Sequence, residues 1–218
     1  MRHLFSILVC IVFYACNTPY YVNVNNMGGQ PATMQLKNGQ TLNGKIQVQS
    51  FDNYSTIRSV AFANGTSKDY QNYDLNQIDN LYFNGSTFYV KMLKDNELWG
   101  GNALRFVKEL SANSKDLKLF ENEIVTKSTD GKEIMERQLF VQLPQNTTEI
   151  YNAQGSKFIP NFDEKVSAYL QNCSALSQKI KDKNKDFFYA FVNQGETKRK
   201  QIWMNILNEY NNCKNKNY

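Results

Sequence analysis

The stretch ATMQLKNGQTLNGKIQVQ, residues 32–49, decides the fold class of this chain. Asn38-Gly39 divides two runs in which apolar and polar side chains alternate, and such a pair is the strongest short-range signal for a β-hairpin. In the second run Ile46 and Val48 share one face, while Lys45, Gln47 and Gln49 share the other. A strand with one apolar and one polar face is typical of an antiparallel sheet packed on a core.

Further turn signals predict that hairpins continue through the first two thirds of the chain. They are Asn64-Gly65, Asn84-Gly85 and Asp130-Gly131. Strands are also expected at residues 104–110, 117–125 and 134–141, and residues 74–78 predict one helical turn leading into a strand. Pro144 is expected to end the last strand, because proline cannot donate to a hydrogen-bond ladder. These signals predict an antiparallel β portion over residues 32–145.

Beyond Pro160 the spacing of apolar residues becomes helical. Asn161 stands three residues before Glu164, which is the spacing of a capping box. Apolar side chains then recur every three or four residues, in stripes formed by Phe162, Val166, Tyr169, Leu170 and Cys173, by Leu176 and Ile180, and by Ile202, Trp203, Ile206, Leu207, Tyr210 and Cys213. The polar ending NNCKNKNY is expected to fray. A helical subdomain over residues 160–213 thus follows the β portion, and the predicted fold class is α+β.

The amino-terminal segment predicts export from the cytoplasm. Arg2 and His3 precede an apolar run over residues 4–15, which is shorter than the roughly 20 residues that cross a bilayer. This is the layout of a secretory signal. The sequence FYAC that ends at Cys16 resembles a bacterial lipobox, in which the cysteine is lipidated and becomes residue one. We therefore expect a signal peptide over residues 1–15 and a lipidated cysteine with its tether over residues 16–31. A plain signal peptide cleaved near Ala15 and a retained signal anchor are the alternatives.

The remaining cysteines predict a disulfide. Cys10 falls inside the apolar run and Cys16 is expected to be acylated, which leaves Cys173 and Cys213. An even pair in an oxidising compartment is usually bridged. Two buried free thiols and a redox pair are the alternatives, and the absence of a Cys-x-x-Cys motif disfavours the redox pair.

Composition excludes several kinds of chemistry. The chain carries 25 Lys and Arg against 20 Asp and Glu, and this mild excess does not suggest a nucleic-acid partner. His3 is the single histidine and leaves with the signal, which removes Ser-His-Asp catalysis and histidine-ligated zinc. No glycine-rich phosphate loop or calcium loop is present. We therefore expect no cofactor, no bound metal and no enzymatic activity.

Three groups of side chains are candidates for binding. Trp99 and Asn102 flank Gly100-Gly101 and could line a ligand groove, although Trp99 could equally pack on the sheet. Tyrosines could form a platform for sugar or peptide, with half-buried strand tyrosines as the alternative; they are Tyr54, Tyr70, Tyr73, Tyr82 and Tyr89. From these two groups we select Trp99, Asn102, Tyr70 and Tyr73. The run Lys198-Arg199-Lys200 could contact anionic head groups or an acidic partner, or form a solvated face.

A wider resemblance supports an envelope location. The segments MQLKNGQTLNGKI, DLNQIDNLYFNGSTFYV, LQNCSALSQKI and ILNEYNNC are similar to a group of secreted Gram-negative proteins without assigned activity, in which a β-rich front half precedes a small helical back half. The resemblance implies architecture and location, and no catalytic residues.

These observations lead to one functional expectation and two rivals. We expect a lipoprotein of the outer membrane, on its periplasmic side, which is attached to the membrane by its lipid and binds a protein, peptide or glycan without catalysis. The rivals are a carboxylate-dependent hydrolase, such as a glycosidase with two Asp or Glu residues, and a structural subunit of an envelope complex.

Overall fold

A computed structural model of the chain describes residues 29–51, 57–94, 103–111, 114–127, 132–146, 148–190 and 195–215. Within these residues the fold is α+β, as the sequence predicts, with strands over residues 30–152 followed by helices over residues 162–215. Several sequence predictions lie outside the described residues. They are those on Cys16, Trp99, Asn102, Tyr54 and the Asp130-Gly131 turn.

The described strands belong to one sheet in the order β10-β9-β8-β7-β6-β5-β1-β2-β3-β4. They are β1 (Gln30–Leu36), β2 (Thr41–Phe51), β3 (Ile57–Asn64), β4 (Gln71–Asp74), β5 (Ile78–Phe83), β6 (Ser86–Lys94), β7 (Ala103–Glu109), β8 (Lys118–Lys127), β9 (Glu133–Gln142) and β10 (Glu149–Asn152). The hairpin expected at Asn84-Gly85 joins β5 to β6, and both residues have positive φ, as a type I′ turn requires. The turn expected at residues 74–78 is the 3-10 helix η2 (Leu75–Gln77).

Strand β10 converts part of the sheet into a closed barrel. It pairs antiparallel with β9 and also parallel with β6, so that β6 to β10 form a ring. The sequence prediction that the β portion ends near residue 145 is therefore wrong, although β9 does end before Pro144. A four-residue strand is too short to show an alternating pattern, and only its pairing with β6 and β9 defines it.

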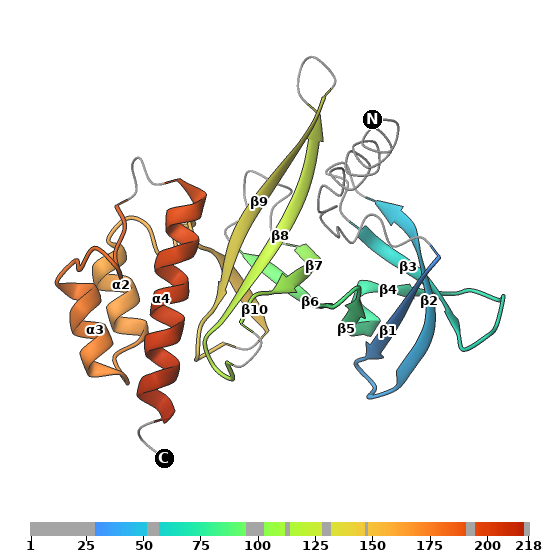
Figure 1. Cartoon of the computed structure of the whole chain (residues 1–218), viewed down its shortest axis with the longest axis horizontal. Coiled ribbons are helices and arrows are strands. Elements are labelled where there is room, and N and C mark those ends of the chain that lie inside the picture. The colour runs from blue at the N-terminus through green and yellow to red at the C-terminus, as the bar shows by residue number, and fades with distance from the viewer. Residues whose placement is uncertain are drawn as a thin grey trace, which may run out of the picture.

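Three hydrophobic cores lie one after another through the molecule, with strands between them (Figure 1). The N-terminal core contains Ala32, Met34, Leu36, Leu42, Ile46, Ile57, Val60, Phe62, Leu75, Ile78, Leu81, Phe83, Phe88, Val90 and Phe106. The barrel core takes one side chain from each barrel strand, namely Leu93, Val107, Phe120, Phe140 and Ile150. The helical core contains Leu117, Leu119, Leu139, Val141, Leu143, Ala153, Phe158, Ile159, Phe162, Val166, Leu170, Cys173, Leu176, Ile180, Tyr189, Ile202, Trp203, Ile206, Leu207 and Tyr210.

The hairpin β6–β7 carries apolar side chains on both faces because it divides two cores. Phe88 and Val90 of β6 face the N-terminal core, whereas Leu93 faces the barrel core. The same alternation in β7 sends Phe106 to the first core and Val107 to the second. Successive strand residues point to opposite faces, so one hairpin can serve both cores.

Helices α2 (Phe162–Tyr169), α3 (Ser174–Lys181) and α4 (Glu196–Asn215) share the helical core with β8 and β9, and α4 packs directly on both strands (Figure 1). The Cys173–Cys213 disulfide is present and joins the start of α3 to α4. All three predicted apolar stripes face the helical core. No helix in the described part of the chain combines the length and apolarity needed to cross a bilayer.

One prediction about helix ends is wrong, and another is tested only in part. Asn161 has φ 67° and ψ 47°, and its side chain makes no capping hydrogen bond. A capping side chain needs an extended backbone at that position, whereas asparagine is also one of the few residues that tolerate the left-handed region. At the other end, the sequence predicts fraying of residues 211–218; α4 includes the first five of them, to Asn215, and residues 216–218 lie outside the described part of the chain. The disulfide holds this end, and Lys214 Nζ lies 5.6 Å from the centre of the Tyr210 ring.

Candidate functional site

The face of strands β2, β1, β5 and β6 that points away from the N-terminal core carries two rows of neutral polar side chains. Strand register places Asn43, Thr33, Tyr82 and Thr87 in one row, and Thr41, Gln35, Asn80 and Tyr89 in the next. None of these side chains is fully buried. We call these eight residues the polar face.

Alternation along the strands creates this face. In β1 the buried residues Ala32, Met34 and Leu36 enclose Thr33 and Gln35, which therefore point the other way. In β5 the buried residues Leu81 and Phe83 flank Tyr82 in the same manner. Such a sheet buries one face and leaves the other to solvent.

Hydrogen bonds across strands orient the amides of the polar face. Thr33 Oγ1 donates to Asn43 Oδ1 at 2.8 Å, and Asn80 Nδ2 donates to Gln35 Oε1 at 2.8 Å. Each amide carries two donors and one acceptor, and each hydroxyl can both donate and accept. The polar face can therefore exchange hydrogen bonds with a ligand in both directions, and none of its eight side chains is an acid or a base at neutral pH.

Tyr82 is the centre of the polar face. Its side chain is 52% exposed, although it lies between Thr33 and Thr87 in a regular part of the sheet. A tyrosine ring has an apolar body and a polar tip, and such rings are enriched where ligands bind. Tyr82 thus supplies a flat apolar surface surrounded by hydrogen-bonding groups.

At the β6 edge the polar face meets a charged cluster at the barrel. Lys118 Nζ lies 2.8 Å from Glu109 Oε1 and 5.4 Å from the centre of the Tyr89 ring. Burial, followed by the charge and hydrogen bond of Glu109, raises the pKa of Tyr89. Burial and the nearby Lys118 lower the pKa of Lys91, whose Nζ lies 5.6 Å from the centre of the Phe120 ring. This cluster marks where the polar face ends.

Part of the run Lys198-Arg199-Lys200 makes contacts within the protein. Helix α4 begins at Glu196, and Lys200 Nζ donates to Glu121 Oε2 of β8 at 2.7 Å. Arg137 Nε of β9 lies 4.0 Å from Glu121 Oε1 and 3.3 Å from Glu123 Oε1. Burial and the charge of Glu121 raise the pKa of Glu196. These contacts attach the start of α4 to the β8–β9 hairpin.

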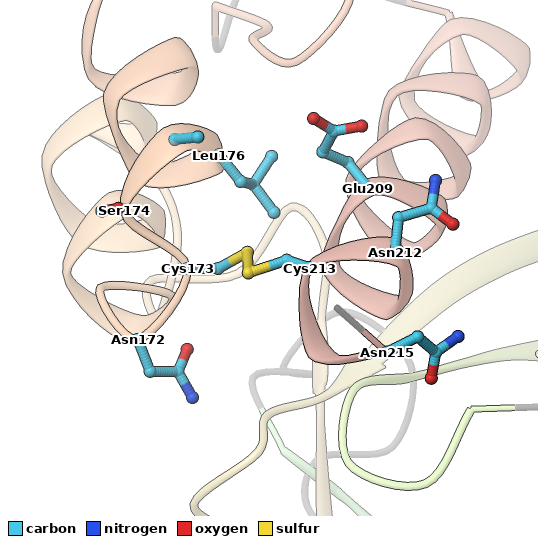
Figure 2. A pocket seen from close by; sticks show the side chains of 9 residues that line it. Asn172, Cys173, Ser174, Leu176, Glu209, Asn212, Cys213 and Asn215 are labelled. Atoms are coloured by element: carbon cyan, nitrogen blue, oxygen red, sulfur yellow. A yellow bond between two sulfur atoms is a disulfide. The ribbon is translucent and has the colours of Figure 1, made fainter. Parts of the chain in front are cut away.

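A groove of about 590 Å³ lies between α3 and α4 and contains the disulfide (Figure 2). We call it the disulfide groove, and its wall includes Asn172, Cys173, Ser174, Leu176, Glu209, Asn212, Cys213 and Asn215. Two of the polar side chains in this wall make hydrogen bonds within the protein. Asn172 Nδ2 donates to the Tyr210 phenol at 3.2 Å, and Lys179 Nζ donates to Glu209 Oε1 at 2.6 Å.

The structure separates the tyrosines that the sequence grouped together. Tyr70 is 38% exposed and precedes β4, at the far end of the sheet order from the barrel. Tyr73 packs against the N-terminal core, and its phenol donates to Gln71 Oε1 at 3.0 Å. Tyr82 points away from that core, so Tyr73 and Tyr82 do not share a face. Tyr82 and Tyr89 do share one, on adjacent strands.

Sequence reasoning missed the threonines and amides of the polar face. The sequence signal for the polar face was present, because polar residues alternate with apolar ones along β1 and β2. The neighbours of those positions depend on β1 pairing with both β2 and β5. The β1–β2 hairpin has the local Asn38-Gly39 signal, whereas the β1–β5 pairing joins segments far apart in the chain and has no local signature.

Comparisons with models of known protein families, with curated proteins and with solved structures find no match to this chain. Within the described ranges, no group of three or more His, Cys, Asp or Glu side chains is placed to hold a metal ion.

Proposed function

We propose that this chain is a lipid-anchored, non-enzymatic binding protein of a bacterial cell envelope, and that it binds a neutral glycan on the polar face. One observation carries the proposal. The exposed Tyr82 ring stands within two in-register rows of uncharged hydroxyl and amide side chains.

The chemistry of a sugar matches this arrangement. Each sugar hydroxyl donates and accepts hydrogen bonds, and the hydroxyl and amide groups of the polar face can do both. The apolar C–H face of a sugar ring can lie on an aromatic ring such as that of Tyr82. A neutral ligand also removes no charge from water when it binds, which avoids the largest desolvation cost.

The polar face suits a glycan better than a protein partner. The centre of a protein interface is rich in aromatic and aliphatic anchors that become fully buried. On the polar face Tyr82 is the large exposed side chain, and its in-register neighbours Thr33 and Thr87 are small and polar. This composition favours a ligand that takes many hydrogen bonds and one ring contact.

The envelope location rests on the amino-terminal segment and on the disulfide. The sequence around Cys16 resembles a lipobox, and a disulfide persists in oxidising compartments. The sequence prediction that the tether extends to residue 31 is wrong, because β1 begins at Gln30. A flexible tether between Cys16 and β1 would have an end-to-end distance of roughly 20 Å. The proposed position is the periplasmic side of the outer membrane, where the tether keeps the polar face near the envelope glycans.

The test is calorimetric titration of the full chain, purified in detergent micelles, with maltoheptaose, cellohexaose and chitohexaose. We expect at least one of them to bind and Tyr82→Ala to weaken that binding by about tenfold or more. Tyr70→Ala is the matched control, because it removes another exposed tyrosine that lies outside the polar face. It should leave the affinity unchanged.

Three results would count against the proposal. One is that none of the three oligosaccharides binds the folded protein, and another is that Tyr70→Ala weakens binding while Tyr82→Ala does not. The third is release of new reducing ends that a single Asp or Glu substitution abolishes, because this would favour the carboxylate-dependent hydrolase.

A further inference from the structure

The two cysteines of the disulfide differ in how deeply they are buried. Cys173 is 1% exposed and belongs to the helical core, where Leu176 and Ile180 are its companions. Cys213 is only partly buried and packs against that core from outside. Both cysteines line the disulfide groove, and Figure 2 shows their bond crossing between the two helices. A thiol that enters the groove can therefore approach Cys213 more easily than Cys173.

The position of Cys173 also favours it as the leaving group. Cys173 is the N-cap residue of α3, and its side chain makes no capping hydrogen bond. Negative charge near a helix N-terminus is stabilised by the helix dipole and the free N–H groups of the first turn. The helix dipole and these N–H groups would act to stabilise a thiolate on Cys173, and a more stable thiolate leaves faster.

We propose that Cys213 is a site of mixed-disulfide formation with a dithiol, either a small molecule or a protein with a Cys-x-x-Cys motif. One thiolate of the dithiol forms an S–S bond with Cys213 Sγ. The Cys173–Cys213 bond breaks, and its electron pair leaves with Cys173 Sγ, which then takes a proton. The second thiolate of the dithiol displaces Cys213 from the mixed disulfide. The protein gains two thiols, and the dithiol is oxidised to its own disulfide.

Exchange at this bond does not require the helices to separate first. Trp203, Ile206 and Leu207 hold α4 in the helical core independently of the disulfide, because they are buried two to three turns before Cys213. Helix α4 continues beyond Tyr210 for only one more turn, and this is the part that the bond fixes. Reduction is therefore expected to free the end of α4 and open the disulfide groove, while the fold persists.

The experiment measures reduction under native conditions. The full chain in detergent micelles is treated with increasing concentrations of dithiothreitol and quenched with iodoacetamide. Mass spectrometry of the Cys173 and Cys213 peptides then gives the rate. Direct attack predicts a rate proportional to dithiothreitol concentration, with an unchanged far-ultraviolet circular dichroism spectrum. A rate that levels off, as opening by unfolding would require, or no reduction without denaturant, would overturn the proposal.

Two further measurements test the site itself. With glutathione as the thiol, the mixed disulfide is expected on Cys213, and its appearance on Cys173 would contradict the proposed direction of attack. Asn212→Trp fills the groove beside Cys213 and should slow reduction about tenfold by obstructing the incoming thiol. Asn208→Trp is the matched control, because Asn208 is exposed on the same helix and does not line the groove. Equal rates in the two variants would show that the groove is not the route.

Discussion

Trp203 donates its indole Nε1–H to the phenol oxygen of Tyr189 at 3.1 Å, and that phenol donates in turn to the Ala153 carbonyl at 2.6 Å. All three residues are buried in the helical core. The chain of two hydrogen bonds joins α4, the segment before it and the residue that follows β10. It therefore connects the helical subdomain to the end of the barrel.

Tyr189→Phe should destabilise the protein, because it removes the partner of two buried polar groups. The Trp203 indole and the Ala153 carbonyl would both lose their bonds to the phenol. Leaving a buried donor or acceptor unsatisfied costs about 1–3 kcal/mol. Urea unfolding followed by circular dichroism measures the loss. Tyr82→Phe, which removes an exposed hydroxyl, is the control and should leave the midpoint unchanged.

Alkaline pH should destabilise the protein partly through Tyr189. Burial raises the pKa of Tyr189 above the ordinary value of 10.0. The folded state therefore keeps this proton where the unfolded state releases it, so stability is full below pH 10.0 and falls as the pH rises above it. The pKa of Lys91 is lowered by burial, and its contribution has the opposite sign because the folded state binds fewer protons. The free energy of unfolding, measured with urea, should fall less steeply from about pH 9 to about pH 11 in Tyr189→Phe than in the wild type. Equal slopes would refute the assignment.

Removal of the disulfide should lower stability without changing the fold. The bridge links residues 40 positions apart. Restriction of the unfolded chain by a loop of this size contributes up to about 4 kcal/mol. The double variant Cys173→Ser/Cys213→Ser should lose stability up to that amount in urea unfolding and should match the reduced wild type. A double variant as stable as the oxidised wild type would be inconsistent with this account.

Gly44→Ala should destabilise the β2–β3 pair. A Cβ atom at Gly44 would overlap the backbone carbonyl oxygen of Ala63 on β3. Backbone atoms cannot rotate away as a side chain can, so the strands must shift, at a cost of about 1–3 kcal/mol. Lys45→Ala, an exposed position on the same strand, should change the free energy of unfolding by less than about 0.5 kcal/mol. Thermal or urea unfolding of both variants makes the comparison.

Cys16 should be acylated in cells. Radiolabelled palmitate is expected to enter the wild type and Cys10→Ser, but not Cys16→Ser, because the lipobox-like sequence directs the lipid to Cys16 alone. Recovery of label from immunoprecipitated protein measures this. Equal labelling of Cys16→Ser would show that the lipid is attached elsewhere, and a mature protein that begins at Asn17 would mean that the segment is a plain signal peptide.

The amino-acid sequence by itself determined the local elements of this protein. Alternation with period two identified the strand around Ile46, and the Asn84-Gly85 pair identified the turn between β5 and β6. Repeats of three and four residues identified the helices that contain Val166 and Trp203. Counting cysteines identified the Cys173–Cys213 bridge. Each of these signals depends on neighbours a few residues apart, because side-chain direction follows from the local backbone period.

The tertiary structure decided what these elements form together. Ile150 completes the barrel core only because β10 pairs with both β9 and β6. Tyr82 belongs to the polar face because β1 brings Thr33 beside it across 49 residues of sequence. Asn161 adopts a left-handed conformation that its capping-box spacing does not predict. Strand pairing and core division join distant segments through backbone hydrogen bonds and packing. Any strand in which apolar and polar residues alternate can form these backbone hydrogen bonds. The sequence pattern alone therefore does not determine which two strands pair.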